Sequence, residues 1–205
     1  MTTTEHDIPA AAGPKLRMTE EEFVAWATED VRAEWVDGEV ILMPPTSFDH
    51  SAVVTWLSIL MGMHTSKHDL GTLTGPEFTA RLHKRRRVPD ILFIAKNRQS
   101  IIQKNHAEGG PDLIVEVVSP DSQSRDRRDK YLEYQAAGVR EYWVIDPASA
   151  NAEFYGLQNA AFVQLPELDG IFRSPVLEGF WLRTEWLWQN PLPNTYEIAK
   201  VIGIF

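Results

Sequence analysis

Residues 111–118 read Pro-Asp-Leu-Ile-Val-Glu-Val-Val, an apolar run typical of a buried strand, with Glu116 inside it. A second run, 88–95, opens Val-Pro-Asp and predicts a neighbouring strand with Asp90 near its start. Burying an ionised carboxylate costs several kcal/mol unless a cation or hydrogen bonds compensate. Two neighbouring strands that each carry an acid therefore suggest a metal site.

Spacing along the strands decides which acids could share one ion. Asp112 and Glu116 lie on one face, but four residues at about 3.3 Å each separate them by roughly 13 Å. We therefore expect Asp112 to begin the strand or to lie in a turn. Asp90 can come level with Glu116, because adjacent strands lie about 4.8 Å apart, and two such carboxylates suit Mg²⁺ or Mn²⁺.

The residues after this strand predict a βαβ unit. The stretch 124–137 has the pattern of a helix, Gly138 supplies a left-handed residue to end it, and a strand follows at 141–145. The two strands should be parallel and the crossover between them right-handed. The predicted fold class is therefore α/β, with a mixed β-sheet flanked by helices.

The N-terminal part predicts a helix followed by a hairpin. Thr19-Glu20-Glu21-Glu22 is a capping box, which predicts a helix over 20–28. Asp37-Gly38 supplies the positive φ angles of a tight turn and predicts a hairpin over 33–43. From 50 to 63, apolar residues recur at three- and four-residue spacing, which indicates an amphipathic helix that lies against the sheet.

Shorter apolar runs predict the remaining strands. The polar stretch 100–110 carries no strong pattern. Two further strands are expected at 71–74 and 77–83. Beyond Asp146-Pro147, runs that alternate with Gly, Pro and Asn predict a C-terminal β meander over 152–156, 161–165 and 182–187.

Composition bounds the class of protein. The 205 residues, 43% of them hydrophobic, fit one globular domain, which we place at 18–205 after a polar tail, 1–17, expected to be disordered. The absence of Cys excludes disulfides and thiolate ligands, and it fits a reducing, cytoplasmic compartment. No stretch approaches the roughly 20 apolar residues of a membrane span, so no membrane association is expected.

Charge is unevenly distributed. The net charge of −9 counts against extended nonspecific binding to polyanions. Two basic patches, 81–87 and 125–130, depart from that average, although a solvated hairpin tip and a solvated helix face are the alternatives. Lys130 is a candidate cation for a phosphate transition state, and an i,i+4 ion pair with Asp126 is the competing interpretation.

A larger pattern joins these segments. It consists of Glu34 before Asp37-Gly38-Glu39, then His50, Pro89-Asp90, 111–120, 126–130, Tyr134 and 138–147. In this pattern the chain resembles the bacterial restriction-endonuclease-like family of the Uma-two type, within the PD-(D/E)XK nuclease superfamily. The resemblance covers roughly 18–187. Its Glu-Val-Val-Ser-Pro and Glu-Tyr-Trp-Val-Ile-Asp-Pro segments are far more specific than a lone Pro-Asp.

The resemblance implies a restriction-endonuclease-like core and a set of site residues. Asp90 and Glu116 would be the metal-binding acids, with Glu34 as a third acid from the N-terminal part. Val118 stands where the superfamily's Glu-x-Lys motif has its lysine. In this family the lysine is expected to come from the following helix, so the role falls to Lys130.

Several of these residues also have ordinary structural interpretations. Apart from the family, Glu34 could equally be a solvated hairpin residue. His50 could contact phosphate or take part in catalysis, but a lone histidine near a helix start more often packs or makes a hydrogen bond there. Aromatic residues are more often core than base-stacking platforms. Those concerned are Trp35, Tyr131, Tyr134, Tyr142 and Trp143.

The leading hypothesis is a divalent-metal-dependent endonuclease, with Mg²⁺ or Mn²⁺ as cofactor, that hydrolyses DNA by attack of metal-activated water. Duplex DNA is the expected partner, and a homodimer is expected because one such site cuts one strand. The alternative is a binding or interaction protein that keeps the nuclease fold without catalysis. A third hypothesis is a metal-dependent hydrolase of small phosphoesters.

Overall fold

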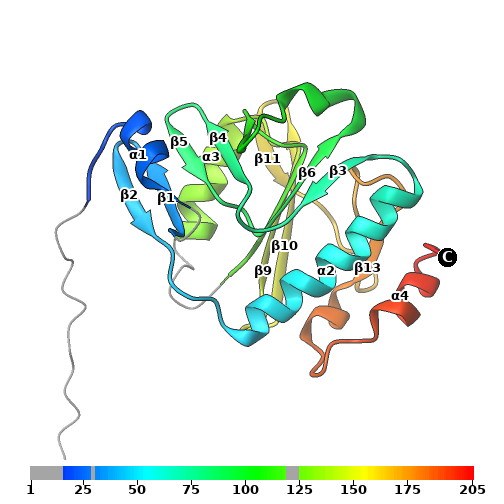
Figure 1. The fold of residues 1–205 in the computed structure, drawn as a ribbon. Helices are drawn as coiled ribbons and strands as arrows, with labels where there is room; N and C mark the ends of the chain where they lie inside the picture. Colours follow the sequence, from blue (N-terminus) through cyan, green and yellow to red (C-terminus); the bar gives the residue numbers. More distant parts are fainter. Residues whose placement is uncertain (1–15, 29–30, 119–124) are drawn as a thin grey trace, which may run out of the picture.

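The computed structural model describes residues 16–28, 31–118 and 125–205 (Figure 1). The helices are α1 (Glu20–Trp26), α2 (Phe48–Lys67), α3 (Tyr131–Ala136) and α4 (Thr195–Val201), with 3-10 helices η1 (Lys96–Ile101) and η3 (Thr184–Trp188) and a π-helical segment η2 (Arg125–Lys130). The strands are β1 (Ala33–Val36), β2 (Glu39–Leu42), β3 (Gly71–Thr74), β4 (Thr79–Leu82), β5 (Arg85–Arg87), β6 (Ile91–Ala95), β7 (His106–Glu108), β8 (Leu113–Val117), β9 (Glu141–Asp146), β10 (Asn151–Gln158), β11 (Ala161–Gln164), β12 (Ile171–Arg173) and β13 (Trp181–Arg183).

The larger sheet has six strands in the order β11-β10-β9-β8-β6-β3. β8 and β9 are parallel and are joined through η2 and α3, which confirms the parallel pairing of the predicted βαβ unit. The other neighbouring strands are antiparallel, so the sheet is mixed, as expected. Gly138, with a φ of 77°, follows α3 in the left-handed conformation that glycine adopts readily.

A second sheet of five strands has the order β2-β1-β5-β4-β7. Asp37 and Gly38 both have positive φ between β1 and β2, as the hairpin prediction requires. The strand expected over 88–95 is shorter, because β5 ends at Arg87 in this sheet and β6 begins at Ile91 in the larger one. The Val-Pro-Asp segment between them therefore joins the two sheets, and it places an acid at their junction.

The core has two main parts, one on each face of the larger sheet. α2 lies across one face (Figure 1), where Leu57 and Leu60 pack in one cluster with Val115 and with the segment from β12 to α4. On the opposite face, Ile114 packs in a cluster with Tyr134 of α3 and with residues of β4. β8 is consequently buried from both sides, which explains its continuous apolar sequence.

The C-terminal part departs from the predicted meander. β10 and β11 pair as expected at the edge of the larger sheet. β13 instead pairs with β12 in a separate two-stranded sheet, and η3 follows it directly. The expected strand over 182–187 is therefore wrong beyond Arg183, because these apolar residues pack on the α2 side of the sheet rather than extend it.

Two further expectations concern the ends of the chain and its surroundings. The expected tail, 1–17, lies outside the described residues except for Leu16 and Arg17. These two lie along β2, where Val40 donates its N–H to the Leu16 carbonyl at 2.9 Å. Within the described ranges, none of the helices has the length and apolar character needed to cross a membrane.

Candidate functional site

Glu34 of β1 is a buried anion held by two cations. Arg87 donates Nη1–H to its Oε2 at 2.7 Å, Val88 donates its backbone N–H to Oε1 at 3.1 Å, and Lys130 Nζ lies 3.4 Å from Oε1. Burial alone would raise the pKa of Glu34, but the ammonium of Lys130 and the guanidinium of Arg87 lower it to about 2. The solvated interpretation of Glu34 is therefore wrong, because its side chain has no exposed area.

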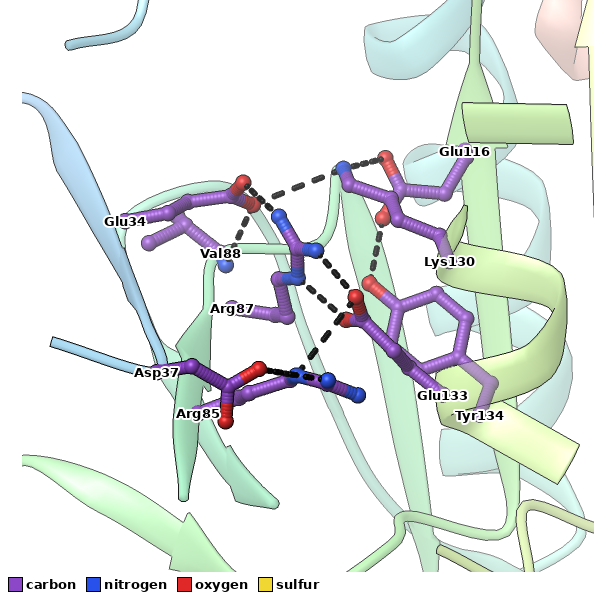
Figure 2. Close-up of polar contacts among 9 residues, drawn as sticks. All are labelled: Glu34, Asp37, Arg85, Arg87, Val88, Glu116, Lys130, Glu133 and Tyr134. Carbon is purple, nitrogen blue, oxygen red and sulfur yellow. Dashed lines mark hydrogen bonds and ion pairs between the residues drawn. The ribbon is translucent and has the colours of Figure 1, made fainter. Parts of the chain in front are cut away.

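Arg87 at the end of β5 connects β1 with α3. Its side chain is 1% exposed, and its Nε and Nη2 groups both donate to the carboxylate of Glu133 while Nη1 donates to Glu34 (Figure 2). Burial opposes the positive charge, but the two carboxylates raise the pKa of Arg87 above its ordinary value. The planar fork of a guanidinium suits such a bridge between two carboxylates.

Lys130 lies between two carboxylates, as Figure 2 shows. Its Nζ donates to Glu116 Oε2 at 2.8 Å, opposite the contact with Glu34. Tyr134 of α3 donates its hydroxyl to the other oxygen of Glu116, at 2.6 Å. Burial, followed by the charge of Glu116, raises the pKa of Tyr134 well above its ordinary value, so the phenol remains a donor.

The described side chains of the basic patch 125–130 differ in exposure. Lys130 is 2% exposed, whereas Arg128 faces solvent. The side chain of Asp126, the alternative ion-pair partner of Lys130, lies outside the described residues. The described partners of Lys130 come from β1 and β8, so a wholly solvated helix face does not describe this patch.

Asp90 lies where the sheets meet. Continuing the register of β6 and β8 by one residue brings Asp90 level with Glu116, as the spacing argument expects. Its Oδ2 accepts the backbone N–H of Val117 at 2.7 Å and Nε2–H of His50 at 3.2 Å. His50 belongs to the first turn of α2, so the hydrogen bond expected for a histidine at a helix start is confirmed.

The patch 81–87 is a hairpin, but its arginines are not solvated at the tip. Arg81 and Arg86 both donate to Glu20 on α1, and Arg87 is buried. These ion pairs neutralise much of the positive charge within the protein. The patch therefore packs α1 onto the second sheet and offers less basic surface than its sequence suggests.

The structure brings three of the four predicted site residues into one network: Glu34, Glu116 and Lys130. Asp90 adjoins this network through the backbone of β8. Sequence reasoning missed the residues that hold the network in place, namely Arg87, Glu133 and Tyr134. Tyr134 is buried in the core, as the sequence predicts, but its hydrogen bond to Glu116 is not predicted. One sequence feature points to Arg87 as a site residue, namely its position directly before the Val-Pro-Asp segment that carries Asp90.

The donor groups limit where a metal ion could be held. Within the described ranges, no three Asp, Glu or His side chains are grouped as metal ligands. Asp90 and Glu116 are the pair that could share a hard cation, because they lie level on neighbouring strands and offer carboxylate oxygens. A cation held by this pair would lie near the C-terminal end of β8, where the Lys130 ammonium contacts Glu116.

Comparison with solved structures defines the class of fold. The crystal structure of a protein from Anabaena variabilis, described as "a putative nuclease belonging to DUF820", is similar with a TM-score of 0.72 and 20% sequence identity. The similarity covers 83% of this chain and 97% of that one. The chain thus has the mixed α/β fold of that protein, which confirms the predicted fold class.

The family comparison is more specific. Residues 20–185 match the family Uma2, described as "Putative restriction endonuclease". The chain belongs to this family, and the resemblance seen in its sequence is confirmed. A comparison with curated proteins gives no match.

Proposed function

We propose that this protein is a divalent-metal-dependent endonuclease of the PD-(D/E)XK type that hydrolyses phosphodiester bonds of DNA. The observation that carries the proposal is the position of Lys130 Nζ, 2.8 Å from Glu116 and 3.4 Å from Glu34, beside the junction that carries Asp90. So many buried charges are costly, and such groups cluster where chemistry uses them. Membership of the Uma2 family supports the same assignment.

The donor set fits Mg²⁺ or Mn²⁺. Asp90 and Glu116 supply carboxylate oxygens, and Mg²⁺ retains several waters, so two protein acids suffice. Glu34, the third predicted metal acid, already accepts hydrogen bonds from Arg87 and Val88. We propose that Glu34 acts by holding Lys130, because two cations, Arg87 and Lys130, already balance its charge, whereas Glu116 shares Lys130 with it and accepts a further hydrogen bond from the neutral phenol of Tyr134.

The roles of the side chains follow from their contacts. When bound, the ion would lower the pKa of a water molecule and stabilise charge on the phosphate. Lys130 presents its ammonium to that charge or orients the attacking water. Tyr134 fixes the Glu116 carboxylate through its hydroxyl, and Arg87 keeps Glu34 in place to hold Lys130.

Cleavage assays with plasmid, linear and single-stranded DNA in Mg²⁺ or Mn²⁺ test this proposal. Asp90→Asn and Glu116→Gln should each lower the rate by on the order of 100-fold or more, because each removes charge at the proposed ion site. The matched control is Glu108→Gln, an exposed acid on β7, which should cleave at the unsubstituted rate. Undiminished cleavage by both site variants would refute the assignment.

The second candidate function is that of a binding or interaction protein that keeps the nuclease fold without catalysis. The net charge of −9 and the internal ion pairs of the patch 81–87 favour it. Calorimetric titration with Mn²⁺ separates the two, since the endonuclease must bind the ion and a binding module has no need of it. Absence of both cleavage and Mn²⁺ binding would favour the second function.

We also propose a homodimer, because cleavage of both strands is simplest with two sites related by a two-fold axis. Gel filtration at two protein concentrations should give the elution volume of a dimer at the higher one. Elution as monomer at both concentrations would contradict the proposal.

A further inference from the structure

A cavity of about 500 Å³ lies beside the proposed catalytic centre. It is bounded by the first turn of α2, the end of β8, the turn between β9 and β10 and the segment that follows η3. The residues used below are Phe48, His50, Val118, Leu187 and Trp188. Its volume falls within the range of about 300–1,000 Å³ that is usual for small-ligand sites.

The cavity has an aromatic and apolar wall. Phe48 is 85% exposed at the N-terminal end of α2, and Trp188 is half-buried among the lining residues. Val118 and Leu187 are buried and line the interior. An aromatic ring that is left almost fully exposed beside an apolar cavity is suited to contact a flat apolar surface.

One buried polar atom of His50 lacks a hydrogen-bond partner. His50 is 8% exposed, and its Nδ1 is the buried side-chain atom without a hydrogen bond among the described residues. Its Nε2 atom lies 3.2 Å from the Asp90 carboxylate, so His50 joins the cavity wall to one of the two proposed metal acids. The unpartnered Nδ1 atom has under 1 Å² of accessible surface, so a ligand in the cavity does not reach it, and the cavity offers its aromatic and apolar faces instead.

A negative charge at the rim of the cavity disfavours an anionic ligand. Asp49 lies in the first turn of α2 and lines the cavity, so a phosphate inside it would meet a carboxylate. The Ser47 hydroxyl already accepts the backbone N–H of His50 at the same helix end. An uncharged nucleobase has flat faces that suit the aromatic wall, and it meets no such repulsion.

We propose that this cavity is a subsite for one unpaired nucleobase of the DNA substrate, next to the phosphate that is cleaved. The inference rests on the proposed nuclease function, because Asp90 links His50 to that centre. Phe48 and Trp188 stack on the base. A base inside a duplex is already stacked and paired, so this subsite selects single strands or DNA with an unpaired nucleotide.

Binding measurements test the subsite separately from catalysis. The full-length protein in EDTA would be titrated into fluorescein-labelled DNA that is single-stranded, perfectly paired, or paired with one bulged nucleotide, with anisotropy as the readout. The single strand and the bulged duplex should bind about tenfold more tightly than the perfect duplex, the effect of stacking one base on an aromatic side chain.

Variants identify the cavity as the cause. Phe48→Ala and Trp188→Leu should each remove most of this preference, and Phe48 is exposed enough that its loss leaves the core intact. Leu168→Ala, at an apolar residue that is 69% exposed and does not line the cavity, is the matched control and should change nothing. Equal binding of the three DNAs, or an unchanged preference in both cavity variants, would overturn the subsite.

Adding Mn²⁺ to the same samples separates the two proposals. Metal-dependent cleavage without any preference for unpaired nucleotides would refute the subsite and leave the endonuclease standing. A preference that depends on Phe48 and Trp188, without cleavage of any DNA, would establish the subsite and refute the endonuclease.

Discussion

Glu34 and Glu141 are both fully buried carboxylates, yet their surroundings shift their pKa values in opposite directions. Two of the contacts of Glu34 are with the cations Arg87 and Lys130, and they lower its pKa to about 2. Glu141 of β9 accepts three short hydrogen bonds from neutral donors. Burial raises the pKa of Glu141 to about 7 in spite of those bonds.

The comparison shows that the kind of donor matters more than the number of hydrogen bonds. Neutral donors satisfy the oxygen atoms of Glu141 but do not replace the solvation of a full charge. At Glu34, the cations Arg87 and Lys130 replace that solvation. The Glu34 network is thus where the protein maintains buried charge, whereas Glu141 connects β9 to Ser174 and Val176 after β12 and has a structural role.

Removal of Arg87 should have the largest effect. Arg87→Met leaves Glu34 and Glu133 buried without their guanidinium and should lower the free energy of unfolding by about 3–5 kcal/mol. Lys96→Met is the control, because Lys96 and its ion-pair partner Asp69 are both exposed and lie outside the Glu34 network. Its cost should stay below about 1 kcal/mol. Urea unfolding at neutral pH measures both, and equal losses would contradict the special status of the Glu34 network.

Glu141 should give stability an unusual dependence on pH. Its pKa rises from 4.5 to about 7 on folding, so the folded state binds more protons between those values. This group therefore favours folding below about pH 4.5, and about 3 kcal/mol is lost as the pH rises through 7. Glu34 acts in the opposite direction, since its lowered pKa stabilises the fold above pH 4.5 and that contribution is lost as the pH falls towards 2.

The Glu141→Gln variant isolates this effect. The difference in unfolding free energy between the variant and the unsubstituted protein should change by about 2.5 kcal/mol between roughly pH 5 and pH 8, in favour of the variant at the higher pH. Taking the difference removes groups that titrate in both proteins, such as His64, whose pKa burial lowers. A constant difference across this range would show that Glu141 stays ionised.

Local rules predicted the parts of the site that depend on one strand and its neighbour. Strand spacing alone placed Asp90 level with Glu116, and the β6–β8 register agrees. Asp37-Gly38 predicted the hairpin that carries Glu34, because two successive positive φ angles define that turn. The family resemblance, rather than geometry, selected Lys130 over its local ion-pair alternative.

The long-range contacts of the site could not be predicted in the same way. Arg87 meets Glu133 across 46 residues, and Glu34 across 53. Those pairs depend on how the second sheet lies against α3, which no local spacing specifies. A run of three arginines is typical of a solvated hairpin, so the sequence gives no direct sign that Arg87 is buried. Its burial follows from the Val-Pro-Asp segment, because the chain passes there from one sheet to the other.

Lys130 provides a test of whether the charged network is ready for a metal ion. Its ammonium contacts Glu116, so it opposes a second cation on that carboxylate by like-charge repulsion. Lys130→Met should therefore bind Mn²⁺ roughly tenfold more tightly, about 1.4 kcal/mol, even though it loses cleavage. Isothermal titration calorimetry measures the affinity. Weaker binding by the variant would show that Lys130 organises the ion site rather than competes for it.

The smallest expected effect concerns one neutral donor to Glu141. Ser174→Ala removes the hydroxyl that donates to Glu141 at 2.8 Å, and a hydrogen bond to a charged acceptor is stronger than one to a neutral acceptor. The substitution should therefore cost about 1 kcal/mol more at pH 8 than at pH 5 in urea unfolding. In the Glu141→Gln background this pH dependence should vanish, because the acceptor no longer titrates. If it persisted there, another group would be responsible, and the contrast between the two buried carboxylates would rest on Glu34 alone.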